Sequence, residues 1–171
     1  MDDEGPFRAV AFELSSLGYA LSRGFKAAME PFELEPREFG LLRNVASKEG
    51  QSQQAIADRL QIPASRMVAI VDELEGRGLV ERRPHAADRR VRELYLTEAG
   101  LALVREASEH AAEYERQITA SLSDQERTQL LELLARIEAG LGMRPGGAHS
   151  ALADGAKAEL GDVQDTASAL A

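Results

Sequence analysis

The chain has no cysteine and no tryptophan, and aromatic residues make up only 5% of its 171 residues. Without cysteine there is no disulfide, no thiolate metal site and no thiol-based redox sensor. The three histidines, His85, His110 and His149, lie too far apart in sequence for a zinc-ligand spacing. A Gly-x-Ser-x-Gly elbow and a phosphate-cradling glycine loop are also missing. We therefore expect neither an enzyme nor a bound metal or cofactor.

No apolar run approaches the roughly 18 residues that span a bilayer. The N-terminal residues MDDEGPFR are acidic, whereas a signal peptide is basic and then apolar. We expect a cytoplasmic protein without a membrane segment. Hydrophobic residues nevertheless make up 44% of the chain, and helix formers dominate. This composition favours a mainly α-helical fold with a buried core.

Positive charge is scarce, because the formal net charge is −9. Residues 51–92 are the one block with a basic excess, eight arginines against six acidic side chains. Within it, the segment 77–92 holds six arginines against Glu81 and Asp88. Charges are screened beyond about 10 Å, so a local basic face on an acidic body can still bind phosphates. An arginine cluster is more often only a solvated surface, so its meaning depends on the elements around it.

Apolar periodicity predicts a helix over 7–29, ended by Pro31. A second helix is expected over 36–48, opened by Glu35-Pro36 and closed by Gly50. Ser52 is a suitable N-cap for a third helix, QQAIADRL, with Ala55, Ile56 and Leu60 directed inward.

A fourth helix is predicted over 63–77, after a two-residue turn. Its inward positions are Met67, Ile70, Val71 and Leu74, and its outward positions are Ser65, Ala69 and Asp72, flanked by Arg66 and Val68. Two short helices joined by a tight turn are typical of a helix-turn-helix. After Gly78 the period changes to two, which predicts strands over 79–83 and 91–96 with PHAADRR between them. A helix-turn-helix followed by such a hairpin is a winged helix.

The rest of the chain is predicted to be helical and then disordered. Thr97 can cap a helix over 98–121, and Ser123 to Glu126 form a capping box that starts a leucine-dense helix ending near 141. We expect residues 7–30 and 98–142 to form a dimerisation region. Residues 143–171 have few large apolar groups and are predicted to be a disordered tail.

The order of these elements and the run LVERRPHAADRRVRELYLTEAG (79–100) resemble the MarR family of bacterial transcription regulators. Asp88 and Arg90 fit the family's Asp-x-Arg wing, and Leu96, Thr97 and Gly100 fit its exit from the wing. The segment QSQQAIADRL is similar to the supporting helix, and SRMVAIVDELEGRGLV to the recognition helix. The resemblance covers about residues 7–142. It implies a mainly α-helical protein with a small β-hairpin wing, in which dimerisation helices flank a winged helix-turn-helix over 35–97.

The resemblance also implies a homodimer that regulates transcription, by repression in the favoured case, from a pseudo-palindromic site on double-stranded DNA. Asp88 by itself could be only a turn former, but we expect it to pair with a wing arginine. A winged helix used only for protein–protein contact is the alternative. The residues expected to contact DNA are Ser52, Gln53, Ser65, Arg66, Val68, Ala69, Asp88, Arg89 and Arg90.

We also expect a small organic molecule to act as the effector that releases the DNA. In MarR-like proteins organic ligands, often aromatic acids, bind where the dimerisation helices meet the winged domain. Carried onto this chain, Phe39 and Leu42 would form an apolar floor, and Arg23, Lys26 or Arg43 would pair with a carboxylate. Tyr19, Arg23 and Lys26 share one helix face, for which the alternative is a solvated stripe.

Overall fold

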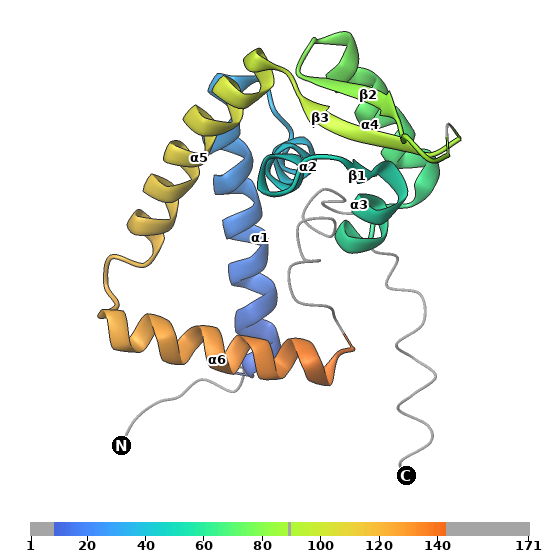
Figure 1. Cartoon of the computed structure of the whole chain (residues 1–171). Coiled ribbons are helices and arrows are strands. Elements are labelled where there is room, and N and C mark those ends of the chain that lie inside the picture. Colours follow the sequence, from blue (N-terminus) through green and yellow to red (C-terminus); the bar gives the residue numbers. More distant parts are fainter. Residues whose placement is uncertain (1–8, 89, 143–171) are drawn as a thin grey trace, which may run out of the picture.

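The computed structural model describes residues 9–88 and 90–142. These residues form a mainly helical protein with a small antiparallel sheet, as the sequence predicts (Figure 1). Phe7, Arg8, Arg89 and the tail expected at 143–171 lie outside the described residues. The elements in chain order are α1 (Val10–Met29), the 3₁₀ helix η1 (Glu30–Phe32), α2 (Pro36–Ser47), β1 (Gln51–Ser52), α3 (Gln53–Leu60), α4 (Ala64–Gly76), β2 (Val80–Pro84), β3 (Arg92–Leu96), α5 (Glu98–Ile118) and α6 (Asp124–Gly140).

The sheet has the strand order β1-β3-β2. The wing is the hairpin of β2 and β3, in which Val80 lies opposite Leu96 and Arg82 opposite Leu94. Strand β1 was not predicted, because two residues are too short to show an alternating pattern. The residue before it, Gly50, has a φ of +73° and donates its N–H to the Leu94 carbonyl at 3.1 Å. Strand β1 therefore ties the start of α3 to the wing.

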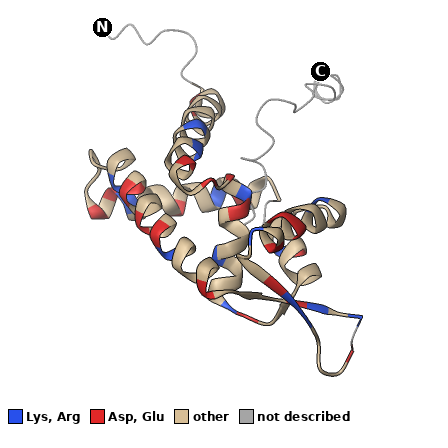
Figure 2. Ribbon diagram, turned by 90° about the horizontal axis from the view of Figure 1, so that it is seen from above, with Lys and Arg blue, Asp and Glu red and all other residues tan. Residues whose placement is uncertain are grey.

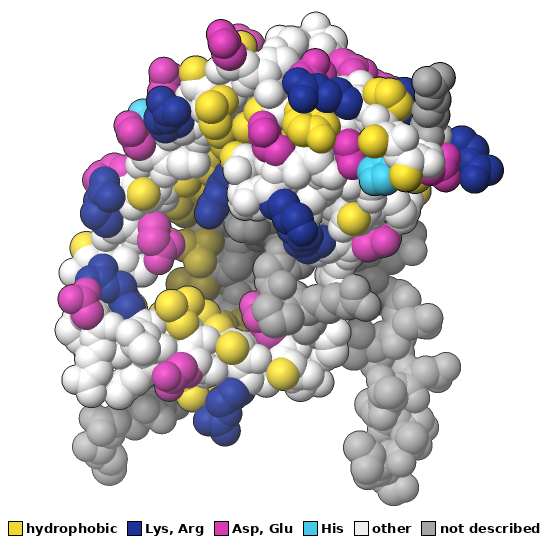
Figure 3. All heavy atoms as spheres, in the orientation of Figure 1, with side chains coloured by type: hydrophobic (Ala, Val, Ile, Leu, Met, Phe, Trp, Pro, Cys, Tyr) yellow, Lys and Arg dark blue, Asp and Glu magenta, His cyan; other side chains and the backbone are white. Residues whose placement is uncertain are grey.

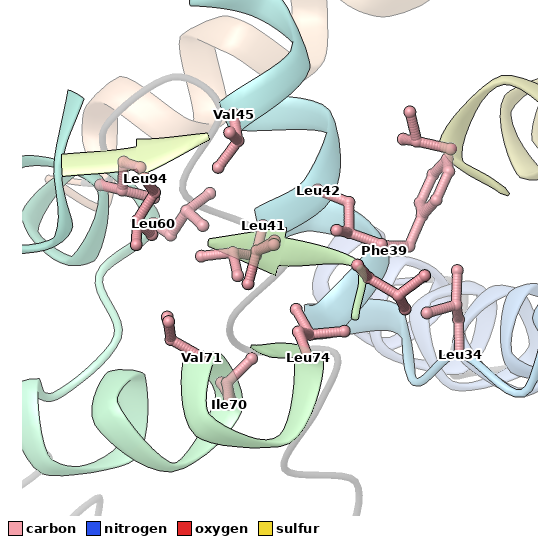
Figure 4. Packing of buried hydrophobic residues seen from close by; sticks show 14 of the residues in the cluster. Leu34, Phe39, Leu41, Leu42, Val45, Leu60, Ile70, Val71, Leu74 and Leu94 are labelled. Carbon is pink, nitrogen blue, oxygen red and sulfur yellow. The ribbon is translucent and has the colours of Figure 1, made fainter. Parts of the chain in front are cut away.

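The hydrophobic core lies inside the winged domain, where α2, α3, α4 and β3 converge (Figure 4). The predicted inward face of α4 is confirmed, since all four of its residues are buried. The predicted face of α3 is wrong in one position, because Ala55 is exposed and Ala57 is buried. Once Ser52 caps the helix, positions 56, 57 and 60 form its one buried face.

Three helix starts follow the predicted capping signals. The Ser52 hydroxyl accepts the Ala55 N–H at 3.1 Å, and the Thr97 hydroxyl accepts the Gly100 N–H at 3.0 Å. The capping box of Ser123 and Glu126 is present at the start of α6. Side-chain caps satisfy backbone N–H groups that have no partner within the helix. These local sequence signals therefore set where α3, α5 and α6 begin.

Helices α1, α5 and α6 form a frame beside the winged domain. Helix α5 packs on α1 at Gly24, where a Cβ atom would lie 2.4 Å from the Tyr114 hydroxyl oxygen. That hydroxyl donates to the Leu21 carbonyl at 3.0 Å. Figure 1 shows α6 crossing the end of α1 that lies away from the wing. No residue of α6 is buried, and none of the described helices is long and apolar enough to cross a membrane.

Candidate nucleic-acid interface and ligand pocket

The outward face of α4 carries small side chains. Ser65, Val68, Ala69 and Asp72 are exposed, and Arg66 is half-buried. Residues 65, 68, 69 and 72 are spaced by three and four, so they form one stripe along the helix. Short side chains allow the helix axis to approach a surface closely, which is the requirement for reading base edges in a major groove.

The wing tip is organised by Asp88, as predicted. Its carboxylate accepts the Arg90 backbone N–H at 3.0 Å and the Arg90 guanidinium Nε at 3.2 Å. These hydrogen bonds from Arg90 hold the pKa of the Asp88 carboxyl below its ordinary value. The Arg90 side chain remains 92% exposed, so the pairing directs the guanidinium without burying it. Figure 2 shows the wing projecting from the body of the molecule with basic residues along it.

Arg82 joins the base of the wing to both helices of the helix-turn-helix. Its guanidinium donates to Asp72 at 2.6 Å, to Glu75 at 2.5 Å and to the Gln53 side-chain oxygen at 3.1 Å. Only 17% of the side chain is exposed. From the sequence, Arg82 was expected only as part of the basic segment 77–92, and this role was not predicted. The sequence signal for a paired arginine was the presence of two carboxylates, Asp72 and Glu75, one turn apart on α4.

Two further arginines of the segment 77–92 are also held by the protein. Arg77 donates to the carbonyls of Glu33 at 2.9 Å and Phe32 at 3.3 Å. Arg83 pairs with Glu81 and lies 4.2 Å from the centre of the Tyr95 ring. The basic surface expected from the arginine count is therefore smaller than predicted and concentrated toward the wing tip.

A recess of about 330 Å³ lies between the start of α3 and the wing. It brings together residues about forty positions apart, including three of those predicted to contact DNA, namely Ser52, Gln53 and Arg90. Arg92 also lines it and was not predicted. The start of a helix presents free backbone N–H groups and the positive end of the helix dipole. With two arginines opposite, the recess is suited to an anion such as a phosphate.

A second recess, of about 440 Å³, lies where α1, α2 and α5 meet. The rings of Phe25 and Tyr114, whose centroids are 6.1 Å apart, form part of its wall, which is largely apolar. Arg43 stands at this wall, with its guanidinium 5.7 Å from the centre of the Phe39 ring. The residues around the recess are Leu21, Phe25, Arg43, Ser108, Ala111, Ala112, Tyr114 and Glu115.

Comparison with known proteins decides the family. Residues 32–91 match the MarR family. The HTH-type transcriptional regulator PecS of Dickeya dadantii is 31% identical over 128 residues, which are 73% of this chain and 77% of PecS. This chain belongs to the MarR family of transcriptional regulators. In the MarR fold α3 is the supporting helix, α4 the recognition helix and the β2–β3 hairpin the wing.

Two solved structures agree with that assignment. The transcriptional repressor CouR bound to a 23-mer DNA duplex has a TM-score of 0.73 and 30% identity, covering 80% of this chain and 97% of its own. CouR from Rhodococcus jostii RHA1 bound to p-coumaroyl-CoA has a TM-score of 0.68 and 28% identity, covering 76% and 92%. PecS is thus a transcriptional regulator and CouR a transcriptional repressor.

In this MarR-family chain, two of the five residues expected to bind a ligand line a recess, and three do not. Arg43 lines the second recess, and Phe39 lines an adjoining hollow on α2. Leu42 is 0% exposed in the core, so it cannot form the floor expected of it. Lys26 pairs with Glu35 at 3.1 Å, and Arg23 lies over Tyr19 at 5.8 Å, outside both hollows. This arrangement matches the solvated stripe that was the alternative for that face of α1.

Sequence reasoning placed the ligand site where the dimerisation helices meet the winged domain, but it did not name the residues that α1 and α5 contribute to the second recess. Leu21, Phe25 and Tyr114 line it, and Gly24 permits the close approach of Tyr114. Gly24 in the middle of a predicted helix was the available signal, because glycine lowers helix stability relative to alanine and leaves room for a close approach. Among the described residues, no group of three or more His, Asp or Glu side chains is placed to hold a metal ion.

Proposed function

We propose that this MarR-family regulator acts as a homodimer that binds a pseudo-palindromic operator and is released from it by a small organic ligand. The observation that carries the proposal is the outward stripe of α4, with its exposed small side chains, next to a wing whose tip presents Arg90. The likeness to CouR, solved on a DNA duplex, supports it.

The mode of DNA binding follows from the shapes of α4 and the wing. Helix α4 enters the major groove with Ser65, Arg66, Val68 and Ala69 toward the base edges. The wing reaches the neighbouring minor groove, where the negative potential of a narrow A·T-rich segment attracts arginine. Arg90 contacts that groove and Asp88 orients it, with Arg89 assigned the same role from the sequence.

The recess between α3 and the wing receives a backbone phosphate. Ser52 and Gln53 contribute the N-terminus of α3, and Arg92 contributes charge. The Ser52 hydroxyl and the Gln53 side-chain oxygen already accept hydrogen bonds from within the protein. Accepting leaves their own donors in place, so the Ser52 O–H, the Gln53 side-chain NH2 and the backbone N–H groups at the start of α3 can all donate to a phosphate.

The apolar surface of α1, α5 and α6 supports the homodimer. Leu131 on α6 is 68% exposed, Leu141 directly after α6 is 71% exposed, and Phe12 on α1 is 63% exposed. Figure 3 shows hydrophobic side chains at the surface of α6 and along α5. Large apolar side chains exposed on several helices of one frame indicate an interaction site. A second copy also places a second α4 in the next half-site, about 34 Å along the duplex.

The recess between α1, α2 and α5 receives the effector. Its apolar wall suits an aromatic ring, and Arg43 can pair with a carboxylate or a phosphate. CouR was solved with p-coumaroyl-CoA, which supports an aromatic acid or its thioester as the ligand class. Because α1 and α5 belong to the dimer frame and α2 to the winged domain, a ligand here can favour one spacing of the two α4 helices.

The test is a binding titration with a labelled duplex taken from upstream of the protein's own reading frame. A scrambled duplex of the same composition serves as the competitor. We expect the upstream duplex to bind at least a hundredfold more tightly, with a strong salt dependence. Equal affinity for both duplexes at every salt concentration, for this and for duplexes selected from a random pool, would refute the proposal and favour a protein-binding winged helix.

A further inference from the structure

The outward stripe of α4 contains an apolar group that a phosphate contact does not explain. Among the described residues of 35–88 and 90–97, Val68 is the one branched aliphatic side chain that is exposed, at 45%. Single exposed apolar residues are common on protein surfaces. Val68 differs in its position, because it stands between Ser65 and Asp72 on the helix face that the proposed function directs into the major groove.

The polar end of the same stripe is already occupied. Asp72 accepts a hydrogen bond from the Arg82 guanidinium at 2.6 Å. Glu75, one turn further along, accepts another at 2.5 Å. These carboxylates therefore join α4 to the wing. The surface left for base contacts is the first half of α4, where Val68 and Ala69 contribute only carbon.

Val68 is also held in a defined place. The Arg82 guanidinium reaches the Val68 carbonyl at 3.4 Å, which ties this turn of α4 to the base of the wing. A valine in a helix has one strongly preferred χ1 rotamer. The two methyl groups are thus presented in nearly one orientation, so contact with a partner costs little further side-chain entropy.

We propose that Val68, with Ala69 beside it, recognises the 5-methyl group of a thymine in each half-site of the operator. The inference rests on the proposed function. The 5-methyl group is the apolar feature of the major-groove edge, and cytosine has only hydrogen at that position. An isopropyl group facing it gains contact with thymine and gains nothing with cytosine. Val68 is then a specificity-determining residue, whereas the wing arginines supply affinity that depends little on sequence.

The experiment removes the methyl group and nothing else. The operator is obtained by selection from a random duplex pool, and each thymine in turn is replaced by deoxyuridine, which keeps every hydrogen-bonding group. Burying one methyl group changes an equilibrium constant by a factor of about four. At one position per half-site we expect a loss of about fourfold in affinity for one substitution, and about fifteenfold when both half-sites are substituted.

Val68→Ala separates this contact from a general effect of deoxyuridine. Alanine is a better helix former than valine, so the variant is expected to fold. It should bind the thymine and deoxyuridine operators with equal affinity. Arg90→Ala is the matched control, because it should weaken binding to both operators and keep the fourfold preference for thymine.

Each outcome bears on a different statement. If no duplex is selected, the proposed function fails and this inference falls with it. If a sequence is selected but every deoxyuridine duplex binds within a factor of 1.5 or so of its parent, the DNA-binding function stands and the thymine contact is overturned. A thymine preference that persists unchanged in Val68→Ala would also overturn it.

Discussion

At the base of the wing, the side chain of Arg82 holds α3, α4 and β2 in one arrangement. Its carboxylate partners Asp72 and Glu75 lie on α4, and Gln53 lies at the start of α3. Hydrogen bonds to charged groups are worth about 1.5–3 kcal/mol, and the exposure of the Asp72 and Glu75 carboxylates places these two pairs toward the lower end. Here the arrangement also decides where the wing tip lies relative to the recognition helix.

The first prediction concerns Arg82→Ala. We expect operator affinity to fall by about tenfold or more, with a loss of about 1–3 kcal/mol in the free energy of unfolding. If Arg82 acts by holding the wing in place, Arg90→Ala should cost much less in the Arg82→Ala background than in the wild type. Anisotropy titrations of the four proteins measure this. Fully additive losses would show that Arg82 and the wing act independently.

Glu38 is a buried acid whose titration contributes to stability. Its side chain is 2% exposed, accepts the Glu35 N–H at 2.8 Å and lies 3.7 Å from the Arg77 guanidinium. Burial is the main cause that raises the pKa of the Glu38 carboxyl above 4.5. The folded state therefore holds this proton more tightly than the unfolded state. The resulting stability is full below pH 4.5 and is lost as the pH rises through the raised pKa.

The second prediction follows from the direction of this pKa shift. The free energy of unfolding of Glu38→Gln minus that of the wild type should increase as the pH rises from about 4.5, because only the wild type loses this contribution. Glu126→Gln is the opposite control, since hydrogen bonds from Ser123 lower the pKa of the Glu126 carboxyl. Its difference from the wild type should fall as the pH rises from acid toward neutral. Urea unfolding at a series of pH values measures both differences, and slopes of the same sign would contradict the assignment.

Among the described elements, α6 is a long helix with no buried residue. It has a capping box and an unbroken helical sequence. Leu130, Leu131 and Leu133 are 42%, 68% and 53% exposed. Most helical stability in proteins comes from packing an apolar face. In the proposed dimer a second copy supplies that packing.

The third prediction is that Leu131→Glu converts the dimer to a monomer at micromolar concentration. A charge buried in an apolar interface costs several kcal/mol. The winged domain should remain folded, because its core contains no residue from α6. Gln129→Glu, which adds the same charge to the same helix, is the control and should remain dimeric. Sedimentation velocity distinguishes the two, and a wild type that sediments as a monomer would refute the dimer itself.

At the scale of the whole molecule, the proposed effector site joins the two functional parts. The recess takes Phe25 from α1, Arg43 from α2 and Tyr114 from α5. The Tyr114 hydroxyl also links α5 to the backbone of α1 through the Leu21 carbonyl. A ligand that fits this recess in one dimer geometry better than in another shifts DNA affinity by the ratio of its two affinities.

The fourth prediction is that aromatic acids or their coenzyme A thioesters release the protein from its operator, whereas peroxide and divalent metal ions do not. Arg43→Gln should reduce the sensitivity to an acid by about tenfold through loss of a charge-assisted hydrogen bond and leave operator affinity unchanged. Lys26→Gln is the control, because Lys26 is engaged with Glu35 outside the recess. Titration of each compound into a preformed complex tests this, and release by metal or peroxide alone would contradict it.

Sequence periodicity and capping residues determined most of the local structure. The inward face of α4, the hairpin and the caps at Ser52, Thr97 and Ser123 follow from neighbours within about four positions. The pairing of Asp88 with Arg90 was predictable for the same reason, since the two residues are two positions apart. Interactions of this range are encoded in the order of the residues.

Only the tertiary structure decided which charges face solvent and which side chains line a recess. Arg82 finds Gln53 from 29 positions away, Tyr114 meets the carbonyl of Leu21 across 93 positions, and Leu42 turns into the core. The pairing of β1 with β3 depends on Gly50 meeting Leu94. A linear pattern carries the polarity of each position but not its distance to residues on other elements. Those distances exist only after the helices have packed, so the number of arginines near the wing overstated the basic surface that the fold presents.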